Sequence, residues 1–243
     1  MRNVWIISTR EFRHYFISPM AYVLAFLLFL ILGGLFAINV YFGLESGQVS
    51  PDGRLVIGPM VTILIFTTPI VTMRLLAEEQ SSGTIELLLT APVRDWELVV
   101  GKWLGAFGFL LALMSVTWIY PLILHRMTDP GIDQGILVAA YVGLALMVAA
   151  ILAIGTLIST FFRSSLAAAG ATLAVILLLW IIGGFASGVG GANEVARYLS
   201  FVSHYYDNFY RGVIDLKDVV YYLSLTALSL FLGSQVMESR RWR

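Results

Sequence analysis

The sequence predicts an all-α membrane protein with six transmembrane helices. Hydrophobic residues make up 59% of the 243 positions and charged residues only 12%, whereas about a quarter of a soluble domain is charged. A helix rises about 1.5 Å per residue, so a run of roughly 20 uncharged residues crosses the ~30 Å hydrocarbon core of a bilayer. Six such runs occur, and the positive charges between them gather on one side.

The predicted spans follow these runs, and their ends are soft because the longest runs exceed one crossing. They cover residues of about 20–42, 56–77, 101–124, 135–162, 165–186 and 218–237. An interfacial helix is expected at 1–18, where Trp5 and Phe16 accompany Arg10 and Arg13, and Pro19 breaks this helix before the first span. This helix either anchors the first span or also touches a cytoplasmic partner.

The pattern of apolar and charged residues predicts a short external helix in the longer connection between the fifth and sixth spans. The apolar residues Val195, Tyr198 and Leu199 recur at helical spacing beside Glu194 and Arg197. An aromatic cluster follows, which suits an interfacial belt or a vestibule at the mouth of a transport path. Its members are Tyr205, Tyr206, Phe209 and Tyr210.

The charge distribution predicts cytoplasmic termini. If both termini and the second and fourth loops share a side, that side holds ten of the fifteen Lys and Arg residues, as the positive-inside rule requires of the cytoplasm. A formal net charge of zero gives no sign of a nucleic-acid partner. The chain has no cysteine, which excludes disulfides and thiolate metal sites. The first run is too long for a signal peptide and is expected to be an uncleaved anchor.

The second and third spans carry features beyond simple hydrophobicity. Pro59 and Pro69 lie in the second span, where Pro69 follows Thr67 and Thr68, so we expect either a structural kink or the lining of a gate. In the third span Gly101 and Gly105 form a G-x-x-x-G pair. That spacing predicts close helix packing, against a partner in the same chain or in another copy.

Several kinds of chemistry have no signature here. The chain lacks a Walker A loop, so ATP hydrolysis needs another chain, which would bind the ATP and Mg²⁺. His14, His125 and His204 lie far apart without H-E-x-x-H spacing, and no G-x-S-x-G occurs, so we expect no metal site, cofactor or catalytic residue. The uncharged runs contain no Asp, Glu or Arg at membrane depth, which counts against a proton-coupled carrier.

The cytoplasmic segment 74–102 does not look like a plain connector. Ser81 to Gly83 give a helix-start signal, Glu86 suits a first turn, and Pro92 ends the helix, which predicts a helix at about 82–90. Its apolar stripe, which includes Leu88, either lies on the membrane or fits a cleft in a partner. In the second case, motion of the partner would reach the second and third spans.

The string EEQSSGTIELLLTAPV, residues 78–93, resembles the signature of type-2 ATP-binding-cassette exporter permeases. The opening MRNVWIISTREFRHYFISPMAYV and the closing SHYYDNFYRGVIDLKDVVYYLSLTALSLFLGSQVMESRRWR resemble the gliding-motility-type branch of that family. One departure is Gln80, where many relatives have a basic residue.

The resemblance implies a permease in the prokaryotic cytoplasmic (inner) membrane that pairs with a second copy of itself or a similar permease. It also implies cytoplasmic ATPase subunits that drive export of an unidentified substrate, and the N-terminal helix would flank the same ATPase. The implied coupling residues are Glu78, Glu79, Gly83, Thr84, Glu86, Leu87, Leu88 and Pro92. The second and fifth spans would face the conduit, for which the candidates are Thr67, Thr68, Pro69, Thr72 and Thr172.

Two other functions remain open at this point. A channel or carrier that works alone would conduct without an ATPase. A membrane anchor would hold an ATPase for mechanical or signalling work and move no cargo.

Overall fold

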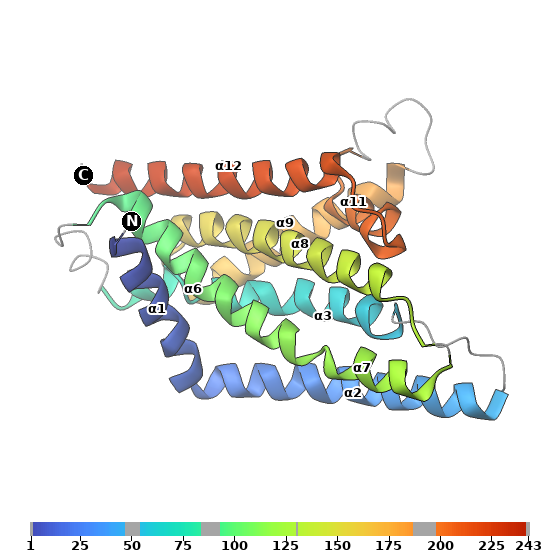
Figure 1. Ribbon diagram of the computed structural model, residues 1–243. Coiled ribbons are helices and arrows are strands. Elements are labelled where there is room, and N and C mark those ends of the chain that lie inside the picture. Colours follow the sequence, from blue (N-terminus) through green and yellow to red (C-terminus); the bar gives the residue numbers. More distant parts are fainter. Residues whose placement is uncertain (1, 47–53, 84–92, 130, 187–197, 242–243) are drawn as a thin grey trace.

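The computed structural model describes residues 2–46, 54–83, 93–129, 131–186 and 198–241 (Figure 1). The regular secondary structure in these ranges is helical, and they contain no strand. Six helical segments are long and apolar enough to cross a membrane, which confirms the predicted fold class. They are Pro19–Gly43, Arg54–Ser81, Asp95–Met127, Gln134–Phe161, Ser165–Ile182 and Leu216–Ser239. A helix satisfies its own backbone hydrogen bonds, so apolar runs of this length fold as helices in lipid.

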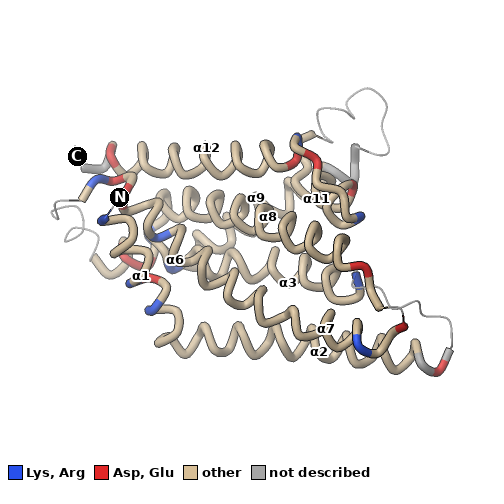
Figure 2. Tube along the Cα trace, viewed as in Figure 1, with Lys and Arg blue, Asp and Glu red and all other residues tan. Residues whose placement is uncertain are grey.

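The helices are arranged as a bundle with both termini at one end (Figure 1). The elements are α1 (Arg2–Ile17), α2 (Pro19–Ser46), α3 (Arg54–Thr72), α4 (Ala77–Ser81), α6 (Asp95–Val116), α7 (Ile119–Met127), α8 (Gln134–Phe161), α9 (Ser165–Ala186), α11 (Phe201–Asp207), the 3-10 turn η1 (Phe209–Arg211) and α12 (Leu216–Arg241). We call the end with both termini the terminal end and the other the distal end. Lys, Arg, Asp and Glu residues lie mostly along the parts of the trace at these two ends (Figure 2).

Helix α8 is the centre of the bundle. It packs against α3, α6, α9 and α12, and 72% of its apolar window is buried. Small residues such as Ala140, Gly143 and Ala150 let neighbouring helices approach it on several sides. By contrast only 11% of the window in α2 and 17% of that in α9 is buried. The large exposed side chains of α2, such as Phe26 and Leu30, therefore face lipid or another protein.

Helix α1 crosses the terminal end at a steep angle to the bundle (Figure 1). It ends at Ile17, and α2 begins with Pro19 at its first position, where the missing N–H costs nothing. Trp5 and Ile17 are strongly exposed on α1, whereas Tyr15 is buried and stacks on Phe109 of α6 at 4.7 Å between ring centroids. An amphipathic helix across the end of a bundle suits the membrane interface.

Between α9 and α12 the structure describes a short helix, α11, at the distal end. It begins at Phe201 because the Ser200 side chain accepts a hydrogen bond from the Ser203 N–H. The expected helix around Glu194 and Val195 lies outside the described residues. Part of the predicted aromatic cluster, residues 205–210, packs inside the bundle. Tyr205 and Phe209 are fully buried, and Tyr205 donates a hydrogen bond to the Ala140 carbonyl of α8 at 3.3 Å.

Candidate functional site

A cleft of about 750 Å³ opens at the terminal end between α1 and the turn from α3 into α4. The residues that line it are Trp5, Ile6, Thr9, Arg10, Glu11, Arg13, His14, Tyr15, Ile17, Arg74, Glu78, Glu79, Ser82 and Lys102. Two of the predicted coupling residues, Glu78 and Glu79, thus lie on the wall of a cleft whose other wall is α1. The mixture of apolar and charged side chains is typical of a surface that contacts another macromolecule.

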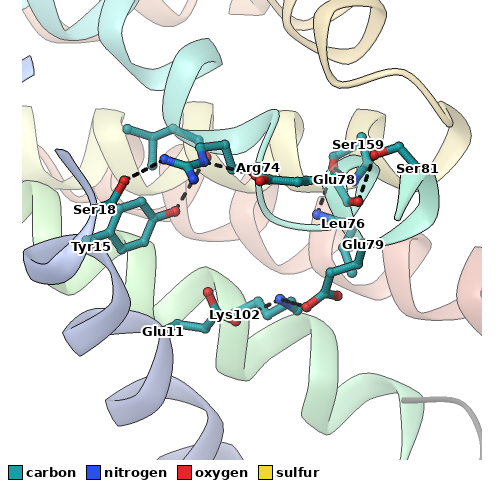
Figure 3. A network of polar contacts seen from close by, with 12 residues as sticks. Glu11, Tyr15, Ser18, Arg74, Leu76, Glu78, Glu79, Ser81, Lys102 and Ser159 are labelled. Atoms are coloured by element: carbon teal, nitrogen blue, oxygen red, sulfur yellow. Dashed lines mark hydrogen bonds and ion pairs between the residues drawn. The ribbon is translucent and has the colours of Figure 1, made fainter. Parts of the chain in front are cut away.

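A buried lysine joins three helices at the base of this cleft (Figure 3). Lys102 of α6 places its Nζ 2.8 Å from Oε1 of Glu11 on α1 and 2.7 Å from Oε1 of Glu79 on α4. Its side chain is 3% exposed, against 17% for Glu11 and 23% for Glu79. A buried ammonium needs paired anions because its desolvation is costly. We call Glu11, Glu79 and Lys102 the lysine triad.

A second set of polar contacts ties the start of the α3–α4 turn to α1 and to the α1–α2 junction. Arg74 Nε lies 2.9 Å from Oε2 of Glu78, and its Nη1 donates to Ser18 Oγ at 2.8 Å. Tyr15 donates from its hydroxyl to the Val71 carbonyl at 3.4 Å. Burial raises the pKa of Tyr15, so this phenol stays protonated and remains a donor. Arg74 is therefore held between the α1–α2 junction and α4.

Helices α4 and α8 cap one another. Ser159 Oγ near the end of α8 accepts hydrogen bonds from the backbone N–H groups of Leu76 at 3.1 Å and Ala77 at 2.9 Å, where α4 begins. In return the Gln80 amide donates to the Thr160 carbonyl at 3.1 Å and to the Ser159 carbonyl at 3.4 Å. Free N–H groups at one helix start and free carbonyls at the other helix end are thereby satisfied. A displacement of α4 must disturb the end of the central helix.

The glycine pair in α6 lets α1 lie close against it. A Cβ on Gly101 would meet Ile7 at 2.8 Å, and one on Gly105 would meet Glu11 Cβ at 2.5 Å and the Ser8 carbonyl oxygen at 2.9 Å. The helix packed on this G-x-x-x-G face is therefore α1 of the same chain, which answers the question the sequence left open. The close approach also brings Glu11 within reach of Lys102.

Three of the predicted coupling residues lie in the described part of the chain. Glu78 and Glu79 make the ion pairs above, and Gly83 adopts φ +73°, a left-handed backbone conformation that favours glycine. The remaining coupling residues lie outside the described residues, and so does most of the predicted helix at 82–90. They are Thr84, Glu86, Leu87, Leu88 and Pro92.

The conduit candidates are packed inside the chain. Thr68, Thr72 and Thr172 are fully buried, Thr67 is 7% exposed, and Pro69 is also buried. The four threonine hydroxyls donate to carbonyls of their own helix, at 2.7 to 3.1 Å. Thr72 fills the space over Gly155, where a Cβ would lie 2.6 Å from its Oγ1. The Thr72 contact packs α3 against α8. The conduit role of these residues stays a prediction.

Glu11, Lys102, Ser159 and Gln80 complete the site, and sequence reasoning did not assign them to it. The chain offered one signal for Lys102, which is a single cation at the start of a long apolar run. The arrangement links α1, α4, α6 and α8 mechanically. The described part of the chain has no group of three His, Cys, Asp or Glu residues that could hold a metal.

A sequence model of the ABC-2 family of transporter proteins matches residues 5–234 of the chain. The match extends from α1 into α12 and so includes every helix that borders the cleft. A comparison with curated proteins finds no match.

Proposed function

The chain belongs to the ABC-2 family of transporter membrane proteins, and from this membership we propose that it is the permease subunit of an ATP-driven exporter. Members of the family are typically non-catalytic membrane components that work with a partner ATPase. We assign ATP and Mg²⁺ binding and hydrolysis to cytoplasmic ATPase subunits that are separate chains. The substrate stays unassigned.

The lysine triad is the structural observation that supports coupling between such an ATPase and the bundle. The segment 84–92 connects α4 to α6, so an ATPase that grips it would pull on both helices at once. Lys102 binds Glu79 of α4 and Glu11 of α1, and Ser159 binds the start of α4 to α8. A pull on the loop would therefore reach α1, α6 and the central helix α8 together. Packed helices with two arrangements transmit such a displacement over long distances.

The remaining assignments follow from sequence and fit the fold. The excess of Lys and Arg supports a cytoplasmic position for the terminal end. The resemblance to type-2 exporter permeases implies a prokaryotic cytoplasmic (inner) membrane. The exposed apolar faces of α2 and α9 are available for lipid and for a second permease copy. The opening and closing strings support membership of the gliding-motility-type branch.

Co-purification and reconstitution test the proposal. The tagged chain, solubilised gently from native membranes, should retain a Walker-containing ATPase, and its ATP hydrolysis should depend on the intact triad. Lys102→Met should keep the ATPase bound but change the hydrolysis rate severalfold. Glu238→Gln is the matched control, because it removes an exposed carboxylate at the same end of the bundle.

A chain that co-purifies without any ATPase and conducts solutes alone in liposomes would overturn the proposal in favour of a channel. An ATPase that binds and is stimulated while no solute moves would instead favour the membrane anchor.

A further inference from the structure

Helix α1 turns a face of mixed apolar and basic side chains away from the bundle. Trp5 and Ile17 are 73% and 77% exposed, and the exposed Arg10 and Arg13 lie between them. Because α1 crosses the bundle steeply, this whole face stays near the level at which α2 begins, at Pro19 (Figure 1). Apolar and aromatic side chains interleaved with arginine suit the headgroup level of a bilayer.

The cleft beside this face has unpaired positive charge. The lysine triad takes up two of its three carboxylates, and Arg74 binds the third, Glu78. Arg10 and Arg13 also line the cleft, and neither makes an ion pair with another described residue. Arg10 attracts Glu79 only over a longer distance. The two arginines are therefore available to an anion from outside the chain, and arginine binds phosphate particularly well.

An apolar groove of about 230 Å³ lies at the same junction, between α2 and α6. Small side chains such as Ala25 and Ala112 leave this space, and α2 packs against α1 and α3 rather than closely against α6. The polar side chains on its wall are Tyr15 and Tyr22, and both hydroxyls already donate to backbone carbonyls. A wall of this kind within a membrane span suits a hydrocarbon chain.

Tyr15 connects the charged cleft to the apolar groove, because it lines both. Its hydroxyl donates to the Val71 carbonyl on the side of Arg74 (Figure 3), and its ring stacks on Phe109 of the groove wall. Arg13 precedes Phe16, also on the groove wall, by three residues, a rise of about 4.5 Å along α1. A cationic site and a hydrocarbon site at this spacing fit the two parts of one lipid molecule.

We propose that the α1–α2 junction binds one anionic phospholipid. Its phosphate lies at Arg10 and Arg13, and one of its acyl chains fills the groove between α2 and α6. The occupant is a lipid and not a protein surface because the apolar face of α1 leads into a groove lined by the first span. A headgroup with net negative charge is preferred, because a zwitterionic one brings its own cation to the two arginines.

The leaflet that supplies the lipid rests on the proposed function, which places the terminal end in the cytoplasm. The site itself needs no ATPase. Its test therefore uses the full-length permease alone, and a failure there leaves the co-purification test of the exporter proposal untouched.

Native mass spectrometry of the delipidated chain, titrated with phosphatidylglycerol or phosphatidylcholine of the same acyl chains, measures the headgroup preference. The wild type should bind phosphatidylglycerol at least severalfold more tightly. Arg13→Gln should weaken phosphatidylglycerol binding about fivefold, the contribution of one basic residue beside anionic lipid, and leave phosphatidylcholine binding unchanged. Arg163→Gln is the matched control, because it removes an exposed cation between α8 and α9 at the same end.

Ala112→Leu tests the groove separately. The added side chain fills the groove and should weaken binding of both lipids by a similar factor, without changing the preference between them. Ala167→Leu places the same side chain at an exposed position on α9 and should have no effect. Phosphatidylglycerol with a photoreactive acyl chain should label residues 109–116 of α6 in the wild type and spare them in Ala112→Leu.

Equal affinity of the wild type for the two lipids would overturn the proposal, as would labelling confined to the outward residues Phe26 and Leu30 of α2, which marks annular lipid only. Displacement of phosphatidylglycerol by inorganic phosphate would show a site for the free anion instead. Loss of ATPase binding in Arg13→Gln with unchanged lipid binding would show that the cleft docks protein.

Discussion

Oε1 of Glu79 lies 2.7 Å from Nζ of Lys102, and this ion pair joins the two sides of the segment 84–92. Glu79 comes before that segment and Lys102 after it, so the contact closes the loop at its base. Lys102 also binds Glu11, which adds α1 to the same unit. The predicted coupling region is therefore anchored on both sides to one buried cation.

Removing that cation should destabilise the terminal end. Lys102→Gln leaves Glu11 and Glu79 facing one another without a counter-charge. Breaking a fully buried ion pair costs roughly 3–5 kcal/mol, and the part-exposed carboxylates here lower the expected loss to about 2 kcal/mol. Chemical unfolding in detergent measures it.

A double-mutant cycle separates the pair from the rest of the site. Lys102→Gln/Glu79→Gln should be more stable than the sum of the single losses predicts, with a coupling energy of about 1 kcal/mol or more. Strictly additive losses would show that the two side chains do not interact.

The cap between α8 and α4 should be measurable alone. Ser159→Ala removes the acceptor of two buried backbone N–H groups, at Leu76 and Ala77. Loss of a helix cap costs about 1 kcal/mol, and a buried unpaired donor costs ~1–3 kcal/mol. The control Ser115→Ala removes a hydroxyl that binds its own helix at an exposed position. Equal thermal stability of the two variants would contradict the capping role.

The glycine face of α6 should tolerate no side chain. Gly105→Ala places a Cβ 2.5 Å from Glu11 Cβ and must push α1 away. Overpacking of this kind costs about 1–3 kcal/mol. Gly170→Ala in α9 is the control, since nothing lies within 4 Å of its added Cβ, and there the higher helix propensity of alanine is worth up to about 1 kcal/mol.

If both glycine variants melt at the same temperature, α1 does not pack on α6 as described. A cysteine cross-link between α1 and α6 gives an independent measure of the same contact, because the chain has no native cysteine.

The transmembrane helices were predictable because a long uncharged run has few alternatives in a bilayer. The site was predictable only in part. Glu79 belongs to a recognisable string, but its partners Glu11 and Lys102 lie 68 and 23 residues away, and no local pattern pairs them. Gln80 illustrates the same limit. In the sequence, Gln80 is notable only because many relatives have a basic residue at this position. In the fold, its side-chain amide donates hydrogen bonds to the carbonyls at the end of α8.

The distal end shows why the partners of a histidine need the fold. His204 and Asp218 are 14 residues apart with a turn between them, and nothing in that spacing indicates a buried pair. The turn depends on Gly212, whose φ of +90° few other residues adopt. Sequence placed His204 near a span end, and the structure adds its contacts with Asp218 and with the Tyr198 carbonyl.

The central claim is that ATP-driven force enters through the segment 84–92 and spreads through the lysine triad. Gly83→Pro tests the entry point, because proline fixes φ near −65° whereas Gly83 has φ +73°. The substitution should leave membrane insertion intact, as should Glu86→Arg, which changes the predicted coupling helix itself. In both variants the ATPase should still hydrolyse ATP, but the permease should no longer move in response.

The most direct measurement is the distance between spin labels on α4 and α12, at Ser81→Cys and Glu238→Cys, in the complex with its ATPase. A nucleotide analogue that traps the ATPase should shift this distance in the otherwise wild-type chain and leave it unchanged in Gly83→Pro. The same distance with and without nucleotide in the otherwise wild-type complex, or an equal shift in both proteins, would contradict the account.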